Sequence, residues 1–321
     1  IIKNKFDLET NEVQGDEDNE DLALEKKKLL VYINFKNLMI KLKDKSTNCV
    51  DPLHFIISCR NHSRDNVWEH LFTGDHQDIS EFIQFIIDFL HELQGKELKT
   101  LNIRNNDESM NINQRITNDI LKCCKIYYSK KFSWFVKKMC FFLINKINCQ
   151  KCSYMTTSYD PNNILFLPIT DSNELTLLDL LDNYFGREVM TDNDWKCDEC
   201  QNNKCNYREF RLVNAPPILM ICLKRTREHQ RVGNYIKENS KVIFPLILNI
   251  DKYLLKLNNT SPKNYQLMGI SNHYGSMNNG HYISICRNNN KWFRFDDETV
   301  TEIDTTDIIT NNAYMLFYQQ I

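Results

Sequence analysis

Glycine and proline are scarce in this sequence, with 8 and 7 among 321 residues. This scarcity argues against a linker array, a collagen-like chain or a long disordered tail. No apolar run approaches the roughly 18–20 residues that cross a bilayer, so no membrane partner is expected. The 40 basic and 42 acidic residues leave a formal net charge of −2, which gives no electrostatic reason to expect nucleic acid as a partner.

A secretory signal is also missing, because no basic start leads into an apolar stretch with a small-residue cleavage site. In a secreted chain the twelve cysteines would suggest a disulfide framework. Four of them instead form two CxxC pairs, which is a pattern typical of a metal site. We therefore expect a reducing, intracellular compartment, cytoplasmic and/or nuclear.

The front of the chain is predicted to be helical and the back strand-rich. Residues 11–28 are strongly charged and predict an exposed loop or linker, followed by a helix at residues 29–42. A largely apolar helix is predicted to begin at Asp78 and to end before Gly95. This order favours an α+β architecture. Strands are predicted at residues 164–169, 207–213, 218–225, 241–248, 265–274, 281–287, 291–297 and 313–320.

The two CxxC pairs are Cys149 with Cys152 and Cys197 with Cys200. Four thiolates at this spacing can close a tetrahedral Zn²⁺ site without an open position, so the predicted role of the zinc is structural. Its binding energy would then stabilise the surrounding lobe. The alternatives are four unrelated buried cysteines, or a zinc ribbon that itself binds a protein or nucleic acid. We interpret the nearby Cys205 as a bystander.

A predicted hairpin near the end of the chain can bring a histidine beside a carboxylate. If Asn288-Asn289 forms a two-residue turn, His281 lies opposite Asp296, and a shift by one residue makes them diagonal neighbours still within reach. A carboxylate bonded to one ring nitrogen leaves the other as a general base. Gly280 would let the backbone approach something closely, such as a substrate chain. Most such pairs are structural, so the pair alone is weak evidence.

Several segments together resemble one family. Residues 272–303 are very similar to the His-box region of ubiquitin-specific proteases, and residues 311–319 resemble the closing strand of that family. Residues 74–93 resemble its Gln-Gln-Asp-containing helix, with His76 where a Gln is usual. The two CxxC pairs and three of the predicted strands follow in the family's order. The resemblance covers roughly residues 29–321.

The resemblance implies a papain-like cysteine protease fold. A helical thumb is expected at about residues 29–135, zinc-ribbon fingers at about 140–212, and an antiparallel β palm at about 160–190 and 213–321. Residues 1–28 form a charged N-terminal segment before them. The implied activity is thiol-dependent hydrolysis of isopeptide or peptide bonds at the C-terminus of ubiquitin. Ubiquitin and ubiquitinated proteins would be the partners.

The same resemblance implies roles for individual residues. His281 would be the general base that activates a thiol, and Asp296 would orient it. Gln77 and Asp78 would contact the substrate's tail, and Tyr282 would line the channel for that tail. The simpler role of Asp78 is a helix N-cap, and that of Tyr282 is a core residue.

One departure from the family concerns the nucleophile. The expected Asn-x-Gly-Asn-Thr-Cys-Tyr box does not occur, and the segment around Cys49 resembles it only faintly. We expect the nucleophile to lie before Ile1 and the 321-residue chain to be inactive. The alternatives are a family member that binds ubiquitin without cleaving it, or a zinc-ribbon interaction module.

Thr226 in place of Phe and Ser80 in place of Gln are smaller departures from the family. The cysteines interpreted as core or surface thiols are Cys59, Cys123, Cys124, Cys140, Cys222 and Cys286.

Overall fold

The computed structural model divides the chain into two compact units, Ile1–Asp75 and His76–Ile321. Each unit is described by itself. The residues that the structure describes are 18–44, 46, 49–64, 66–97, 110–129, 131–169, 174–191, 194–228, 235–256, 263–276 and 279–321.

The first unit contains the helices α1 (Asp18–Lys43) and α2 (Leu53–Ser63) and the short helix η2 (Glu69–Phe72). The prediction of a loop at residues 11–28 was wrong for residues 18–28, which belong to α1. This segment is rich in Leu, Glu and Lys, which favour a helix even where few apolar residues mark a buried face. Residues 11–17 lie outside the described residues.

In the second unit, α3 (Ile79–Gln94) confirms the helix predicted after Asp78. The Asp78 side chain caps it by accepting the backbone N–H of Ser80 at 2.7 Å. Gly95 follows the last helical residue with a φ of −62°, so the left-handed conformation is not what requires a glycine there. A Cβ at Gly95 would lie 2.8 Å from Cβ of Lys131, so a close approach explains it.

Other short helices of this unit had no prediction. Two of them begin with capping boxes, in which the N-cap side chain and the side chain three residues later satisfy each other's backbone N–H groups. The helices are α4 (Ile112–Tyr128), α5 (Trp134–Met139), α6 (Leu177–Tyr184), η3 (Asp251–Tyr253) and η4 (Thr305–Asp307).

The larger sheet of the second unit has the order β15-β14-β13-β12-β16-β7-β3, with β11 paired to β12. β3 and β7 are parallel, and the other neighbours are antiparallel. Within the described residues its strands are β3 (Ile164–Pro168), β7 (Ile218–Lys224), β11 (Ile247–Asn249), β12 (Asn264–Gly275), β13 (Gly280–Asn288), β14 (Lys291–Asp296), β15 (Thr299–Ile303) and β16 (Ala313–Gln320).

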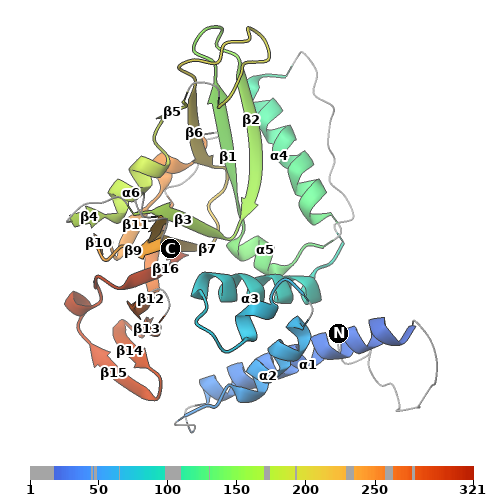
Figure 1. Ribbon diagram of the computed structural model, residues 1–321, viewed down its shortest axis with the longest axis vertical. Helices are drawn as coiled ribbons and strands as arrows, with labels where there is room; N and C mark the ends of the chain where they lie inside the picture. Colours follow the sequence, from blue (N-terminus) through green and yellow to red (C-terminus); the bar gives the residue numbers. More distant parts are fainter. Residues whose placement is uncertain are drawn as a thin grey trace. The chain divides into compact units, whose positions relative to one another are not determined.

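A second sheet has the order β2-β1-β6-β5, and Figure 1 shows β1 and β2 as long neighbouring strands beside α4. Two-stranded pairs join β4 to β10 and β8 to β9. The single strand predicted at residues 241–248 is divided into β10 and β11, because Pro245 between them lacks the N–H that a ladder needs. The bounds are β1 (Phe141–Asn148), β2 (Met155–Asn162), β4 (Glu174–Thr176), β5 (Glu188–Val189), β6 (Tyr207–Leu212), β8 (Thr226–Glu228), β9 (Tyr235–Lys237) and β10 (Lys241–Ile243).

The larger sheet is covered on both faces. Alternate residues of β7 divide between two clusters, because successive side chains of a strand point to opposite faces. Leu219 and Ile221 join the main core with Leu180 of α6, whereas Met220 joins a smaller cluster with Ile87 of α3. Helices α6 and α3 therefore pack on opposite faces, and α3 is held against the strands that carry the candidate site.

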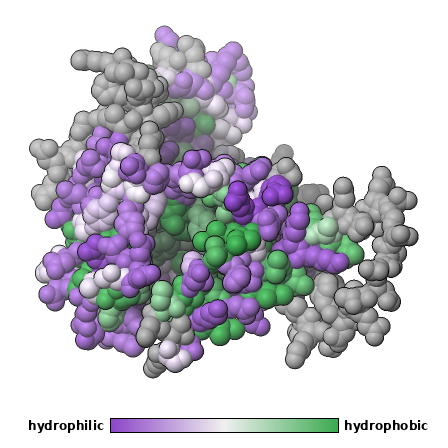
Figure 2. All heavy atoms as spheres, turned by 60° about the horizontal axis from the view of Figure 1, so that its bottom comes forward, coloured by the Kyte–Doolittle hydropathy of each residue, from purple (hydrophilic) through white to green (hydrophobic). Residues whose placement is uncertain are grey.

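None of the helices in the described part of the chain combines the length and the apolar character that crossing a membrane requires. In the view of Figure 2, hydrophilic side chains cover much of the described surface, with hydrophobic side chains between them.

Candidate functional site

The hairpin of β13 and β14 carries the predicted histidine and carboxylate. Its two-residue turn is Asn289-Asn290, with φ values of 47° and 67°, one residue later than the turn first considered. The asparagines therefore adopt the positive φ that such turns favour. This register makes His281 and Asp296 diagonal neighbours across the hairpin, as the shifted alternative predicted.

The two side chains are in hydrogen-bonding contact. Nε2 of His281 lies 2.7 Å from Oδ1 of Asp296, so the two side chains are within the hydrogen-bonding distance that the hairpin predicted. Their catalytic role stays a prediction. The side chains are 48% and 32% exposed, so the pair remains accessible to solvent. The hydrogen bond to Asp296 raises the pKa of His281, and the charge of Asp297 adds to this effect. Within the described residues, Nδ1 of His281 has no hydrogen-bond partner.

Arg294 is a neighbour of this pair that the sequence analysis missed. Its guanidinium donates to Oδ2 of Asp296 at 2.6 Å, so the two carboxylate oxygens have different partners. The signal was available in the spacing, because residues two apart on a strand share one face. Arg294 precedes Asp296 by two residues on β14.

A pocket of about 150 Å³ brings together the three predicted substrate-contacting residues. It lies between the segment that leads into α3, with Gln77 and Asp78, and the strands of the larger sheet, with Tyr282. Two departures from the family pattern, His76 and Thr226, also line it. His281 is not among the described residues of the lining. The remaining lining residues are Arg225, Lys237, His273 and Tyr314.

Both oxygens of the Asp78 carboxylate already have partners. Oδ1 accepts the backbone N–H and the hydroxyl of Ser80, which is the N-cap role. Oδ2 accepts the hydroxyl of Tyr314 on β16, so a substrate donor would have to share an oxygen with one of these partners. Each oxygen still has a further lone pair, so an additional donor can be accepted.

Three rings form one wall of the pocket, and we call them the aromatic wall: His273, Tyr282 and Tyr314. His273 stacks on Tyr282 with ring centroids 4.5 Å apart, and Tyr314 lies edge-on to both at 6.1 Å. A Cβ at Gly280 would lie 2.1 Å from Nε2 of His273. The close approach predicted at Gly280 is therefore made by His273 of the neighbouring strand.

Two cations also line the pocket. The Arg225 side chain is 1% exposed and donates to the carbonyls of Ala313 at 2.7 Å and Glu238 at 2.9 Å. Burial lowers the pKa of Arg225 to about 10. This value still lies above neutral pH, so the guanidinium is charged there. Lys237 donates to the carbonyl of His273 at 2.7 Å and so ties β9 to β12. Both cations thus fix the strands behind the aromatic wall.

The four cysteines of the CxxC pairs lie in two loops of matching geometry. In each loop the backbone N–H of the first cysteine bonds to a carbonyl beyond the second, at 2.8 Å for Cys149 and 2.9 Å for Cys197. The residue after the second cysteine has a positive φ, 60° at Ser153 and 59° at Gln201. This turn directs both sulfurs of each pair to one side.

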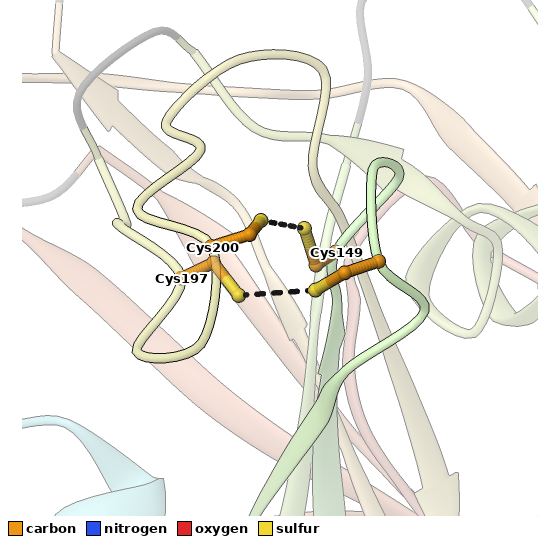
Figure 3. Close-up of side chains that lie close together, drawn as sticks. Cys149, Cys197 and Cys200 are labelled. Carbon is orange, nitrogen blue, oxygen red and sulfur yellow. Dashed lines mark hydrogen bonds between the residues drawn. The ribbon is translucent and has the colours of Figure 1, made fainter.

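The sulfurs of the two loops face each other, as Figure 3 shows for three of them. Sγ of Cys149 lies 3.5 Å from that of Cys200, and Cys152 lies 3.6 Å from Cys197. A tetrahedral site with metal–sulfur bonds of 2.3 Å needs sulfurs about 3.8 Å apart, so the four residues could bind a metal with a small expansion. Cys205 is exposed and lies outside this group.

The hydrogen bonds among these sulfurs lower the pKa of Cys149 and raise that of Cys152, so negative charge is favoured at Cys149. Burial alone would raise the pKa of Cys149, but hydrogen bonds from the backbone of Cys152 and Lys151 and from the Cys200 thiol lower it to about 6. The side-chain amide of Asn202 also points at Sγ of Cys149, at 3.9 Å. These donors would support a thiolate that binds a cation.

Six thiols outside the two CxxC pairs have the opposite environment. A raised pKa leaves little thiolate, which is the nucleophilic form. No described thiol of the second unit hydrogen-bonds to His281. Burial raises the pKa of Cys59 and Cys222 to about 12, and it also raises the pKa of Cys123, Cys124, Cys140 and Cys286.

Comparison with known proteins identifies the family. Residues 3–318 match the family described as "Ubiquitin carboxyl-terminal hydrolase". The chain belongs to this family. It is 31% identical over 257 residues to ubiquitin carboxyl-terminal hydrolase 2 of Homo sapiens, covering 77% of this chain and 41% of that protein. It is 28% identical over 283 residues to ubiquitin carboxyl-terminal hydrolase 8 of Saccharomyces cerevisiae, covering 85% and 55%.

Solved structures share the fold of this family member. The SAGA DUB module of Ubp8, Sgf11, Sus1 and Sgf73 bound to ubiquitin aldehyde matches with a TM-score of 0.63 and 25% identity, over 84% of this chain and 53% of that chain. The module bound to monoubiquitin matches with a TM-score of 0.64 and 24% identity, over the same shares. The α+β architecture is thus confirmed. The chain spans about half the length of the curated relatives it matches.

We expect Asp296→Asn to lower the pH at which His281 titrates. The wild-type midpoint should lie above the usual value of about 6.5, because the carboxylate stabilises the imidazolium. Nuclear magnetic resonance of the ring protons measures both midpoints. Asp297→Asn is the control, and it should give a smaller shift because that carboxylate lies 3.9 Å from Nε2. Equal midpoints in Asp296→Asn and the wild type would contradict the coupling.

Proposed function

We propose that this chain carries the general base and its orienting acid for thiol-dependent hydrolysis of isopeptide or peptide bonds at the C-terminus of ubiquitin. The observation that carries the proposal is the His281–Asp296 contact of 2.7 Å on an exposed hairpin, in a member of the ubiquitin carboxyl-terminal hydrolase family. The accessible ring and the charged partner are what a general base requires.

The geometry assigns distinct tasks to the two ring nitrogens. Nε2 of His281 donates its proton to Asp296, so Nδ1 is the nitrogen that accepts a proton from a thiol. The thiolate then attacks the carbonyl carbon at the end of ubiquitin, and the imidazolium returns the proton to the leaving amine. Asp296 remains ionised and stabilises the imidazolium while it exists.

The thiol itself, on this proposal, is none of the cysteines in residues 76–321. Four of them are the cysteines of the two CxxC pairs, which we call the metal group. Burial raises the pKa of five others, Cys222 among them. Cys205 is exposed, but it lies in the segment that follows the second CxxC loop. Cys49, in the first unit, is exposed and is therefore the first candidate if the chain acts alone.

The pocket that contains Gln77, Asp78 and Tyr282 is the proposed contact with the tail of ubiquitin. The solved DUB modules that share the fold are bound to monoubiquitin or ubiquitin aldehyde, which supports ubiquitin as the partner. The aromatic wall supplies flat apolar surface, and Asp78 supplies a carboxylate for a basic tail. An intracellular location, cytoplasmic or nuclear, is part of this proposal, and the ubiquitin partner and the metal-site pattern of the two CxxC pairs support it.

The metal group is proposed to hold one structural zinc ion. Four cysteine sulfurs leave no position open for substrate, and soft thiolates select zinc among common intracellular ions. The site would join the loop between β1 and β2 to the loop before β6, and so order the proposed fingers. The proposed thumb, fingers and palm keep the residue ranges expected from the sequence.

The zinc proposal predicts one equivalent of zinc per chain purified without chelator. Cys197→Ser should reduce this equivalent and lower the thermal midpoint, because three ligands hold the ion less well than four. Cys205→Ser is the matched control and should keep the metal, since its side chain lies outside the group. Elemental analysis that finds less than half an equivalent in the wild type would count against the proposal.

For ubiquitin, we expect Tyr282→Ala to weaken binding about tenfold, because truncating an aromatic side chain in a contact pocket typically costs more than about 1 kcal/mol. Isothermal titration calorimetry with free ubiquitin measures the change. Tyr184→Ala, also half-buried but on α6 and outside the pocket, should leave the affinity within about twofold. Equal losses in both variants would remove the pocket from the proposed interface.

The 321-residue chain alone should not hydrolyse a fluorogenic ubiquitin conjugate. A base without its nucleophile has nothing to activate. Turnover that is abolished by a thiol-blocking reagent would contradict this expectation, and Cys49→Ser would then be the first variant to test. Binding of ubiquitin without turnover agrees with the expectation.

A further inference from the structure

The carboxylate of Asp296 is shared between an imidazole and a guanidinium. Oδ1 lies 2.7 Å from Nε2 of His281, and Oδ2 lies 2.6 Å from a terminal nitrogen of Arg294. The side chains of Asp296 and Arg294 are 32% and 44% exposed. Solvent therefore competes for each of these hydrogen bonds.

An exposed carboxylate with one partner does not keep a single orientation. Its terminal torsion is broad, so water can replace either hydrogen bond. The carboxylate of Asp297 is also near, with one oxygen 3.9 Å from Nε2 of His281. A guanidinium nitrogen that binds the second oxygen of Asp296 restricts this rotation, because turning the carboxylate would break that charge-assisted hydrogen bond.

We propose that Arg294 is a positioning residue, which holds Oδ2 of Asp296 so that Oδ1 stays directed at Nε2 of His281 and Nδ1 stays unprotonated. This inference rests on the proposed function in one respect, namely that His281 is the base. Its geometric content concerns the tautomer of one histidine and needs neither ubiquitin nor a thiol.

Electrostatics gives Arg294 a second, measurable effect. The carboxylates of Asp296 and Asp297 raise the pKa of His281, whereas the positive charge of Arg294 lowers it. A base must be neutral to accept a proton, so Arg294 limits the fraction of imidazolium that Asp296 alone would produce. Loss of Arg294 therefore has two opposed effects on the titration midpoint of His281, because it removes a positive charge and also releases the hydrogen bond from Asp296 that raises the pKa.

A purely structural role of Arg294 would predict a lower thermal midpoint when its side chain is removed. Exposed ion pairs contribute little to folding, so we expect removal of Arg294 to leave the thermal midpoint almost unchanged. The matched control is Lys291→Gln, because Lys291 lies on the same strand and pairs with Glu302 at 2.8 Å instead of with Asp296. It removes the same charge from β14 without releasing the Asp296 carboxylate.

The experiment compares the wild type, Arg294→Gln, Arg294→Lys and Lys291→Gln by ¹⁵N and ¹H magnetic resonance of the imidazole over a pH series. Above its midpoint, wild-type His281 should be the single tautomer with Nε2 protonated. Arg294→Gln should give a mixture of tautomers, which is the readout that decides the inference. Arg294→Lys should restore part of the wild-type preference for one tautomer, and Lys291→Gln should match the wild type in both tautomer and midpoint.

Two results would overturn the inference. One is an unchanged tautomer in Arg294→Gln, and the other is an equal change of tautomer in Lys291→Gln. The proposed function fails separately. If the chain does not bind ubiquitin while Arg294→Gln still alters His281, Arg294 positions the histidine, but the role of that histidine as a base for ubiquitin hydrolysis is contradicted.

Discussion

The position of β16 between β12 and β7 is the constraint on which the rest of the second unit depends. This strand joins the hairpins of β12–β15 to the parallel pair β7 and β3. The hydroxyl of Tyr314, on β16, binds the N-cap carboxylate of Asp78 and so fixes the start of α3. The carbonyl of Ala313, also on β16, accepts from the buried Arg225. The pocket exists because one strand near the end of the sequence binds segments from far earlier, a non-local arrangement.

The region of the two CxxC loops lacks such a constraint. Cys149 and Cys152 lie at the tip between β1 and β2, where, among the described strands, β6 and the short β5 extend the sheet. Cys149 and Cys197 are buried there, at 3% and 0% exposed, whereas Cys152 is exposed. Four converging sulfurs thus occupy the place of an apolar core, and a bound metal would supply the stability that packing provides in the larger sheet.

Local patterns in the sequence predicted most strands, the capped helix α3 and the reach between His281 and Asp296, because alternation, capping and hairpin turns are short-range properties. The same patterns could not predict the partner of Asp78 in Tyr314, since that contact joins residues 236 positions apart. The close approach predicted at Gly280 is present, but its partner could not be predicted for a related reason, because that partner is a side chain of another strand. Helix α1 was missed at its start because charged helix formers and charged loops have similar compositions.

The two histidines of the β12–β13 hairpin illustrate what sequence alone cannot assign. Both belong to the segment that resembles the His box, yet their environments shift their pKa in opposite directions. Burial, with the charge of Lys237, lowers the pKa of His273, whereas the hydrogen bond to Asp296 raises that of His281. Nε2 of His273 is packed against Gly280 of the neighbouring strand, and its ring is stacked on Tyr282. His281 is half exposed, and its carboxylate partner leaves one nitrogen unoccupied. Placement at the exposed end of the hairpin, more than residue type, therefore selects which imidazole is suited to proton transfer.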